Sequence, residues 1–174
     1  MSENSSAFRK ATDEAVARIG SLLTRRSHTL SAAESVTGGL VSDAIVSVPG
    51  ASAFFRGCIV AYSDAAKESL LGVSRETLAV HGAVSGETAL EMARGAARVF
   101  RSTVALSTTG IAGPAGQTKH KRTGLAYIAV VYADREAVSE RIYEGNREKV
   151  RRSCALDALR LCMEMAGREL AVDD

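Results

Sequence analysis

The sequence predicts a layered α/β/α fold, a single domain with a mixed, partly parallel sheet. Segments with helical apolar periodicity alternate with short β-prone runs over most of the 174 residues, and this alternation is typical of α/β domains. Two late β-prone runs, 125–132 and 138–143, are joined by a short turn and add an antiparallel hairpin. The length suits one domain. We therefore expect one unit over residues 1–174, with flexible tails at about 1–6 and 171–174.

The first part of the chain predicts a helix, a strand and a second helix. Apolar residues recur at helical spacing over residues 7–25. Residues 28–33 are typical of a short strand. Residues 38–48 begin with two glycines, continue as an apolar segment and predict a helix that stops before Pro49.

The middle of the chain repeats this order. Residues 58–62 form a continuous apolar run and predict a strand. Ser63 is suited to cap a helix over 64–71, because its hydroxyl can accept a hydrogen bond at the helix start and Asp64 places negative charge there. Residues 86–100 predict a further helix.

The last part begins with a strand and ends with a helix. Residues 104–109 predict a strand that leads into a glycine-rich loop at 110–116. The hairpin follows, and Asn146 can cap a last helix that we expect to run to about Gly167.

Charge and composition exclude several classes of function. The net charge of +2 is too small to argue for direct nucleic-acid binding. No apolar run approaches the roughly 18 residues that a membrane span needs, and the polar start shows no signal segment, so we expect a cytoplasmic protein. The three cysteines and three histidines are scattered, which favours free buried thiols and predicts no metal site.

Small and hydroxyl residues gather directly after the first predicted strand. Ser35, Thr37, Gly38 and Gly39 would place hydroxyls and backbone N–H groups at the start of a helix. That arrangement suits an anion or an oxyanion. Simple capping of the helix explains the same residues equally well.

A lysine and a tyrosine follow the next predicted strand. Lys67 lies one turn into a helix and can point across the end of the sheet toward Ser35, beside Tyr62. A desolvated lysine has a lowered pKa and can act as the base for a serine hydroxyl. Taken alone, Lys67 is most simply a solvated helix residue and Tyr62 a core residue.

The glycine-rich loop is a third candidate. Thr109, Gly110 and Gly113 would let the backbone approach a ligand closely. No Gly-Lys-Ser/Thr follows, so this is not a Walker loop. A plain surface loop fits the pattern equally well.

The last helix begins with positive charge, which opposes the helix dipole. Arg147 and Arg151, with Lys149 and Arg152, lie in its first turns. These side chains are either solvated or hold an anion such as a phosphate.

Six short motifs follow one another between residues 33 and 147. They are Ala33-Glu34-Ser35-Val36-Thr37-Gly38-Gly39, Val48-Pro49-Gly50-Ala51-Ser52, Ala61-Tyr62-Ser63-Asp64-Ala65-Ala66-Lys67, His81-Gly82-Ala83-Val84-Ser85, Thr109-Gly110-Ile111-Ala112-Gly113-Pro114 and Gly145-Asn146-Arg147. In this order they resemble the CinA C-terminal domain family, whose members include the bacterial nicotinamide-nucleotide amidases. With the flanking helices, the resemblance covers almost the whole chain.

The resemblance implies hydrolysis of nicotinamide mononucleotide to nicotinate mononucleotide and ammonia. The family's catalytic serine, lysine and tyrosine fall on Ser35, Lys67 and Tyr62. For such a reaction we expect backbone N–H groups near Thr37 to Gly39 to stabilise the oxyanion, and Arg147 or Arg151, with the loop from Gly110 to Gly116, to hold the 5′-phosphate. The resemblance further implies a small-molecule nucleotide as partner, a homo-oligomer, and no metal or cofactor. Many relatives carry a second, N-terminal domain, for which we expect no room here.

Some positions depart from the family pattern. Val36, Asp64 and Asn146 stand where the family usually has Cys, Asn and Asp, and the stretch 115–123 differs. The nucleophile and the base are unaffected, but the fit of the substrate is open. Two alternatives therefore remain: a non-catalytic module that senses a nucleotide, and a regulatory module of competence or DNA damage.

Overall fold

The sheet has five strands in the order β2-β1-β3-β4-β5. The computed structural model describes residues 3–116 and 121–170. The strands are β1 (Leu30–Glu34), β2 (Phe55–Val60), β3 (Val104–Gly110), β4 (Leu125–Tyr132) and β5 (Arg135–Ile142). β1 pairs in parallel with β2 and β3, whereas β4 is antiparallel to both β3 and β5. The sheet is therefore mixed and partly parallel, as predicted.

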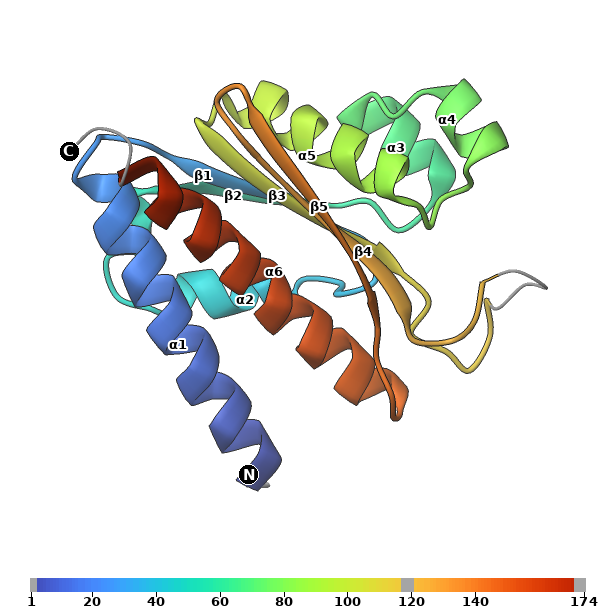
Figure 1. Cartoon of the computed structure of the whole chain (residues 1–174), viewed down its shortest axis with the longest axis horizontal. Helices are drawn as coiled ribbons and strands as arrows, with labels where there is room; N and C mark the ends of the chain where they lie inside the picture. The colour runs from blue at the N-terminus through green and yellow to red at the C-terminus, as the bar shows by residue number, and fades with distance from the viewer. Residues whose placement is uncertain (1–2, 117–120, 171–174) are drawn as a thin grey trace.

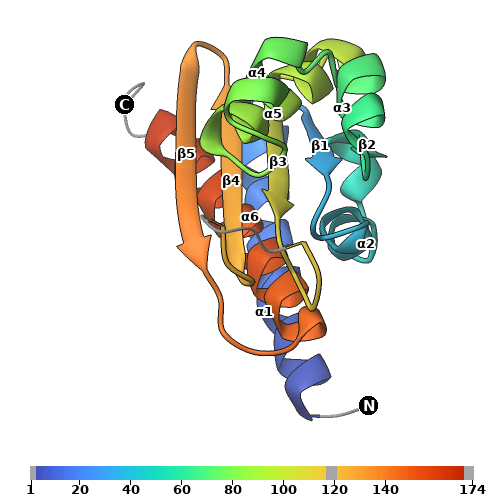
Figure 2. The same ribbon diagram turned by 90° about the vertical axis from the view of Figure 1, so that its right-hand side faces the viewer.

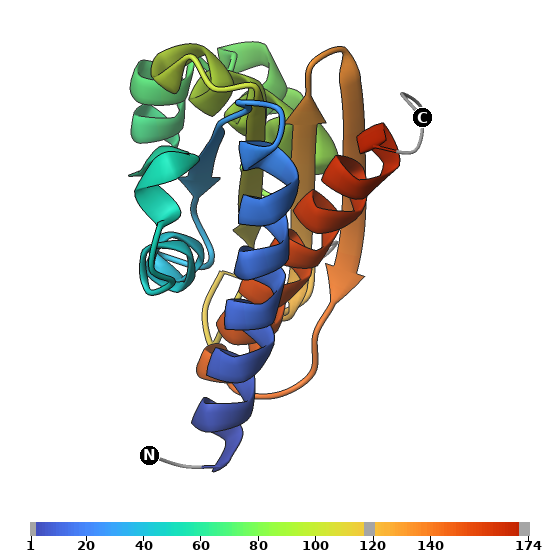
Figure 3. The same cartoon turned by 90° about the vertical axis from the view of Figure 1, so that its left-hand side faces the viewer.

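Helices cover both faces of this sheet (Figure 1). On one face lie α1 (Glu3–Thr24), α2 (Leu40–Val46) and α6 (Arg147–Leu170). On the other lie α3 (Asp64–Leu71), α4 (Arg75–Val80) and α5 (Gly86–Phe100). Figures 2 and 3 show the two layers from the sides, with α5 close to the strands and α1 alongside α6. A single 3₁₀ turn, Ala51–Ala53, precedes β2.

Alternating side chains of the strands form two separate cores. Leu30 and Leu106 belong to the core under α1, α2 and α6, while Ala33 and Ala105 pack with Met92 of α5 in the other core. This follows from the strand period of two, because successive side chains point to opposite faces.

The order of connections places a switch point beside β1. The chain leaves β1 through α2 to reach β2 on one side, and returns through α3, α4 and α5 to β3 on the other side. In open α/β sheets, ligands bind at the carboxyl ends of the strands where the connections diverge in this way. The loops after β1 and β3 are therefore where a site is expected.

The structure corrects several predicted boundaries. The strands at 28–33 and 58–62 are observed at Leu30–Glu34 and Phe55–Val60, and the last strand begins at Arg135 rather than 138. The helix α4 was not predicted, because none of its residues is buried and it carries no apolar stripe.

The predicted tails fall partly outside the described residues. Residues 3–6 are the start of α1, whereas residues 1–2 and 171–174 lie outside the described part of the chain. Within the described residues, no helix combines the length and apolar character that crossing a membrane requires.

Candidate active site

A cavity of about 250 Å³ opens at the carboxyl ends of β1 and β3. Six residues that the sequence singled out line it: Ser35, Tyr62, Lys67, Thr109, Gly110 and Arg147. The loop after β3 leads to the next strand, β4, as the sequence predicted. A larger hollow of about 570 Å³ lies between α1 and the start of α6, but its lining includes no candidate nucleophile paired with a base.

Ser35 and Lys67 meet at the inner wall of this cavity. The Lys67 Nζ atom lies 3.3 Å from Ser35 Oγ and 3.3 Å from the carbonyl oxygen of Ala61. Ser35 follows β1 directly, and its backbone N–H donates to Thr108 O, which continues the pairing with β3. The hydroxyl is therefore fixed to the end of the sheet and lies within reach of one amino group.

Burial changes the proton affinity of the lysine. Lys67 is only 2% exposed, and burial lowers the pKa of its amino group, while the negative charge of Asp64 opposes this shift. The Asp64 carboxylate lies 3.9 Å from Nζ and its side chain is largely exposed. An amine with a lowered pKa is neutral in a larger fraction of molecules near neutral pH, which a general base requires.

Tyr62 and Arg147 close the outer side of the cavity. The Arg147 guanidinium donates one hydrogen bond to the Tyr62 hydroxyl at 2.6 Å and another to Gly113 O at 2.9 Å. Tyr62 is 61% exposed, so it is a rim residue and not the core residue that its place at a strand end allows. Gly113 does not line the cavity; its carbonyl oxygen accepts a hydrogen bond from Arg147.

The turn from Ser35 to Gly39 contributes less to the cavity than the sequence suggested. The Thr37 hydroxyl is buried and pairs with the Thr108 hydroxyl at 2.7 Å. Gly38 and Gly39 adopt left-handed backbone conformations, with φ of 58° and 99°, and do not line the cavity. The Gly39 N–H donates to the Glu34 carboxylate at 2.8 Å, so it is not available to an oxyanion.

Arg151 also lies outside the cavity lining. Its guanidinium donates to Thr37 O through two nitrogens, at 3.2 and 2.7 Å. To hold a phosphate it would have to leave this carbonyl. Of the two candidate arginines, only Arg147 faces the cavity.

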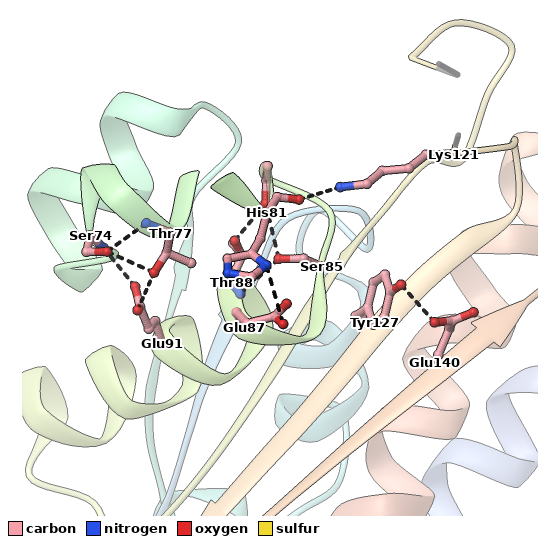
Figure 4. A network of polar contacts seen from close by, with 11 residues as sticks. Ser74, Thr77, His81, Ser85, Glu87, Thr88, Glu91, Lys121, Tyr127 and Glu140 are labelled. Carbon is pink, nitrogen blue, oxygen red and sulfur yellow. Dashed lines mark hydrogen bonds and ion pairs between the residues drawn. The ribbon is translucent and has the colours of Figure 1, made fainter. Parts of the chain in front are cut away.

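The segment 81–85 also contributes to the cavity wall, and its sequence matches a family motif that predicts no chemical role. Ala83 and Val84 line the cavity, and Thr109 Oγ1 donates to Ala83 O at 2.6 Å. Figure 4 shows the polar contacts that hold the segment: Ser85 and Thr88 donate to Gly82 O, and Lys121 donates to His81 O. The short apolar pair gives no chemical signal of its own, so the motif's position was the only clue.

Other cavity residues also went unpredicted. Val36 and Asp64 line the cavity without having been singled out for it, whereas Ile111, Ala112, Ala115 and Gly116 belong to the glycine-rich loop that the sequence named as a candidate. Asp64 was recognised only as a favourable charge at a helix start, and the sequence does not reveal that its side chain faces Lys67. No cluster of potential metal ligands is found among residues 3–116 and 121–170.

The fold and the cavity define a class of protein: a doubly wound α/β domain with a buried serine–lysine pair at the switch point of its sheet. A sequence model of the CinA C-terminal domain matches residues 12–166. The chain therefore belongs to the CinA C-terminal domain family.

Relatives of known sequence agree with this membership. The chain is 42% identical over 154 residues to a CinA-like protein of Anaeromyxobacter sp. (strain Fw109-5), with 88% of this chain covered. It is 47% identical over 143 residues to a CinA-like protein of Syntrophobacter fumaroxidans, with 82% covered. These matches cover 38% and 34% of the two relatives, so the chain spans little more than a third of their length.

Solved structures of similar length share the fold. A CinA superfamily protein of Klebsiella pneumoniae 700603 superimposes with a TM-score of 0.86 at 30% identity, covering 90% of this chain and 98% of that one. The competence/damage inducible protein CihA of Agrobacterium tumefaciens has a TM-score of 0.85 at 36% identity, covering 88% and 94%.

Proposed function

We propose that this protein is an amidohydrolase that converts nicotinamide mononucleotide to nicotinate mononucleotide and ammonia through an acyl-enzyme on Ser35. The observation that carries the proposal is the 3.3 Å contact between Lys67 Nζ and Ser35 Oγ, made by a lysine whose pKa burial lowers. Nucleophile and base within reach of each other form the minimal unit of nucleophilic catalysis. The choice of nicotinamide mononucleotide as the substrate comes from the resemblance to the family's amidases.

The proton path follows from this pair. Neutral Lys67 takes the proton of Ser35 as its oxygen attacks the carboxamide carbon. The tetrahedral intermediate then collapses, the C–N bond breaks, and the lysine returns the proton to the departing amine, which leaves as ammonia. A water molecule attacks the resulting ester, again with Lys67 as base, and releases the nicotinate product and free Ser35. We assign to Tyr62 the orientation of the amino group or the relay of the proton, as the family resemblance implies; in this structure its hydroxyl accepts a hydrogen bond from Arg147.

The contacts of the turn after β1 remove Gly39 from the expected oxyanion donors and add Val36. Within the described part of the chain, the N–H groups of Val36, Thr37 and Gly38 have no protein acceptor, whereas that of Gly39 is occupied by Glu34. Val36 also lines the cavity, so its N–H is our first choice. A donor aimed at the developing negative charge is worth roughly 3–4 kcal/mol of barrier.

Arg147 is our candidate for the phosphate. It faces the cavity, and a guanidinium suits the geometry of a phosphate. The Tyr62 hydroxyl and Gly113 carbonyl that it contacts now hold it at the rim.

An ammonia-release assay tests the proposal. Purified protein is incubated with nicotinamide mononucleotide, with nicotinamide and with the dinucleotide, and Ser35→Ala is assayed in parallel. We expect ammonia from the mononucleotide in preference to the other two, and none above background from Ser35→Ala. Turnover by Ser35→Ala at a substantial fraction of the wild-type rate would remove Ser35 as the nucleophile.

The names of the structural relatives from Klebsiella pneumoniae and Agrobacterium tumefaciens refer to competence and damage, so a regulatory module of that kind is the second candidate. A non-catalytic sensing module would bind the nucleotide in the same cavity without releasing ammonia. Saturable binding measured by calorimetry, together with no turnover, would favour it.

A further inference from the structure

Glu34 is a buried carboxylate directly beside the proposed nucleophile. It is the last residue of β1 and is 0% exposed. Because side chains alternate along a strand, Glu34 and Ser35 point to opposite faces of the sheet. Ser35 reaches the cavity, whereas Glu34 reaches the start of α2.

The carboxylate gathers four donors from two elements. Its Oε2 atom accepts from the N–H groups of Gly39 and Val41, at 2.8 and 3.2 Å. Its Oε1 atom accepts from the N–H of Ser42 at 2.8 Å and from the Cys58 thiol of β2 at 3.4 Å. Burial and the charge of Glu34 raise the pKa of the Cys58 thiol, which keeps its proton available for this bond.

These contacts close a short loop around Ser35. The chain leaves β1 at Glu34, turns through Gly38 and Gly39 with positive φ, and returns so that the start of α2 binds the same Glu34. At the other end, the Ser35 N–H is held by Thr108 O. The nucleophile therefore lies in a turn that is fixed at both ends, and Glu34 forms one of the two attachments.

We propose that Glu34 is a positioning residue for Ser35. Its carboxylate sets the shape of the turn from Ser35 to Gly39 and so keeps the serine hydroxyl within reach of Lys67. The inference rests on the proposed function, because it assumes that Ser35 is the nucleophile. Small displacements of a reacting group are costly: a shift of about 1 Å can lower a rate roughly 100-fold.

Glu34 acts here through geometry and not through its charge on the base. It does not line the cavity, and the charge that shifts the pKa of Lys67 is that of Asp64. Loss of Glu34 should therefore lower kcat and leave the acidic midpoint of the pH–rate profile in place. A residue that only caps a helix would change stability without changing kcat at a temperature well below Tm.

The test variant is Glu34→Gln, which keeps the size of the side chain. An amide offers one acceptor oxygen where the carboxylate offers two, so it cannot satisfy all three N–H groups of α2. The matched control is Glu91→Gln. The Glu91 carboxylate likewise accepts hydrogen bonds at a helix start, from the N–H of Ser74, which caps α4, and from Thr77 Oγ1 of α4 (Figure 4). None of the residues of α4 lines the cavity.

The first measurement follows amide hydrogen exchange by NMR and needs no substrate. In Glu34→Gln we expect the Gly39, Val41 and Ser42 amides to exchange roughly tenfold faster or more, with the core amides of β3 unchanged. In Glu91→Gln the same three amides should keep their wild-type rates. Unchanged exchange in Glu34→Gln would overturn the proposal, because the turn would then not depend on the carboxylate.

The second measurement determines the reactivity of Ser35 in two ways: the rate of ammonia release and the rate at which a fluorophosphonate labels Ser35. In Glu34→Gln we expect both kcat and the labelling rate to fall roughly tenfold or more, at similar KM and an unchanged acidic midpoint. Wild-type kcat and labelling despite faster exchange would show that Glu34 is only a cap. If Glu34→Gln does not fold, Glu34→Asp, which is one methylene shorter, takes its place with the same expected directions.

The two readouts separate this inference from the proposed function. If the wild-type protein releases no ammonia yet is labelled at Ser35, the proposed substrate is wrong, and the labelling rate of Glu34→Gln still decides the role of Glu34. If the wild-type protein is not labelled at Ser35 and releases no ammonia, both claims fail, because there is then no nucleophile to position.

Discussion

The amino group of Lys67 lies in a buried environment, where a positive charge is costly. It is almost fully buried, and among the charged groups only Asp64 favours its protonated form. The folded protein therefore favours the neutral amine more strongly than bulk water does. Each unit by which the pKa falls corresponds to about 1.4 kcal/mol of free energy between the two protonation states. The geometry alone makes Ser35 and Lys67 neighbours; burial is what gives the lysine the chemistry of a base.

The pH dependence of the rate follows from these two charges. Turnover should be lost as the pH falls through the pKa of Lys67, with a midpoint below the usual 10.5, because protonation removes the base. Asp64→Asn removes the charge that raises this pKa, so the acidic midpoint should move further down. A pH–rate profile of kcat/KM for both proteins checks this. An upward shift in Asp64→Asn would contradict the assignment of Lys67 as the titrating group.

Arg147 donates to the rim tyrosine and is our candidate for the phosphate contact. Arg147→Ala should weaken binding of nicotinamide mononucleotide much more than binding of its dephosphorylated riboside, by about 1–3 kcal/mol for one charge-assisted contact. Calorimetric titration of both ligands measures the difference. The control is Tyr62→Phe, which removes the hydroxyl that Arg147 contacts but keeps the guanidinium. Equal weakening of both ligands by Arg147→Ala would show that the arginine acts through Tyr62 instead.

At the scale of elements, the sequence predicted most helices and strands and located the ends of several poorly. The apolar periodicity of α5 and the apolar run of β4 determine their positions, because each is buried against the core. The helix α4 has no buried residue and shows only the cap Ser74. Short elements with little burial leave too weak a pattern to be read from one sequence.

The start of α6 shows how tertiary contacts decide the role of a charge. Its cations differ only slightly in sequence position, yet Arg147 faces the cavity, Arg151 binds Thr37 O, and Arg152 pairs with Glu148 at 2.7 Å. The sequence allowed these cations to be either solvated or anion-binding. The structure gives the three arginines different surroundings.

Arg151 accordingly should matter for stability more than for the phosphate. Arg151→Ala leaves Thr37 O without its charged donor, which should cost about 1–2 kcal/mol of unfolding free energy after relief of the helix dipole is subtracted. Urea unfolding followed by circular dichroism measures this. Lys149→Ala is the control, because it removes a cation from the same turn. Within the described residues, the Lys149 side chain makes no hydrogen bond. Selective loss of phosphate binding in Arg151→Ala would instead return this arginine to the site.

At the scale of the whole molecule, the position of the cavity follows from the order of the strands. β1 lies between β2 and β3. The chain leaves β1 toward α2 on one face and leaves β2 toward α3 on the other, so the carboxyl ends of the three parallel strands meet where these connections diverge. The sequence placed hydroxyl and glycine residues in the segments after β1 and β3 without giving the strand order. The sequence therefore predicted which residues lie near the site better than it predicted which side chains point into the cavity. The Thr37 side chain is buried against Thr108 instead, and the sequence assigned Glu34 no role.

The central claim is that Ser35, activated by Lys67, forms an acyl-enzyme. Partitioning with hydroxylamine tests it most directly, because hydroxylamine competes with water for an ester intermediate. With nicotinamide mononucleotide, we expect added hydroxylamine to divert product from the nicotinate to the hydroxamate while the rate of ammonia release does not fall. Ser35→Ala should yield neither product. Undiminished formation of the nicotinate at every hydroxylamine concentration, or hydroxamate formation by Ser35→Ala at the wild-type rate, would contradict an acyl-enzyme on Ser35.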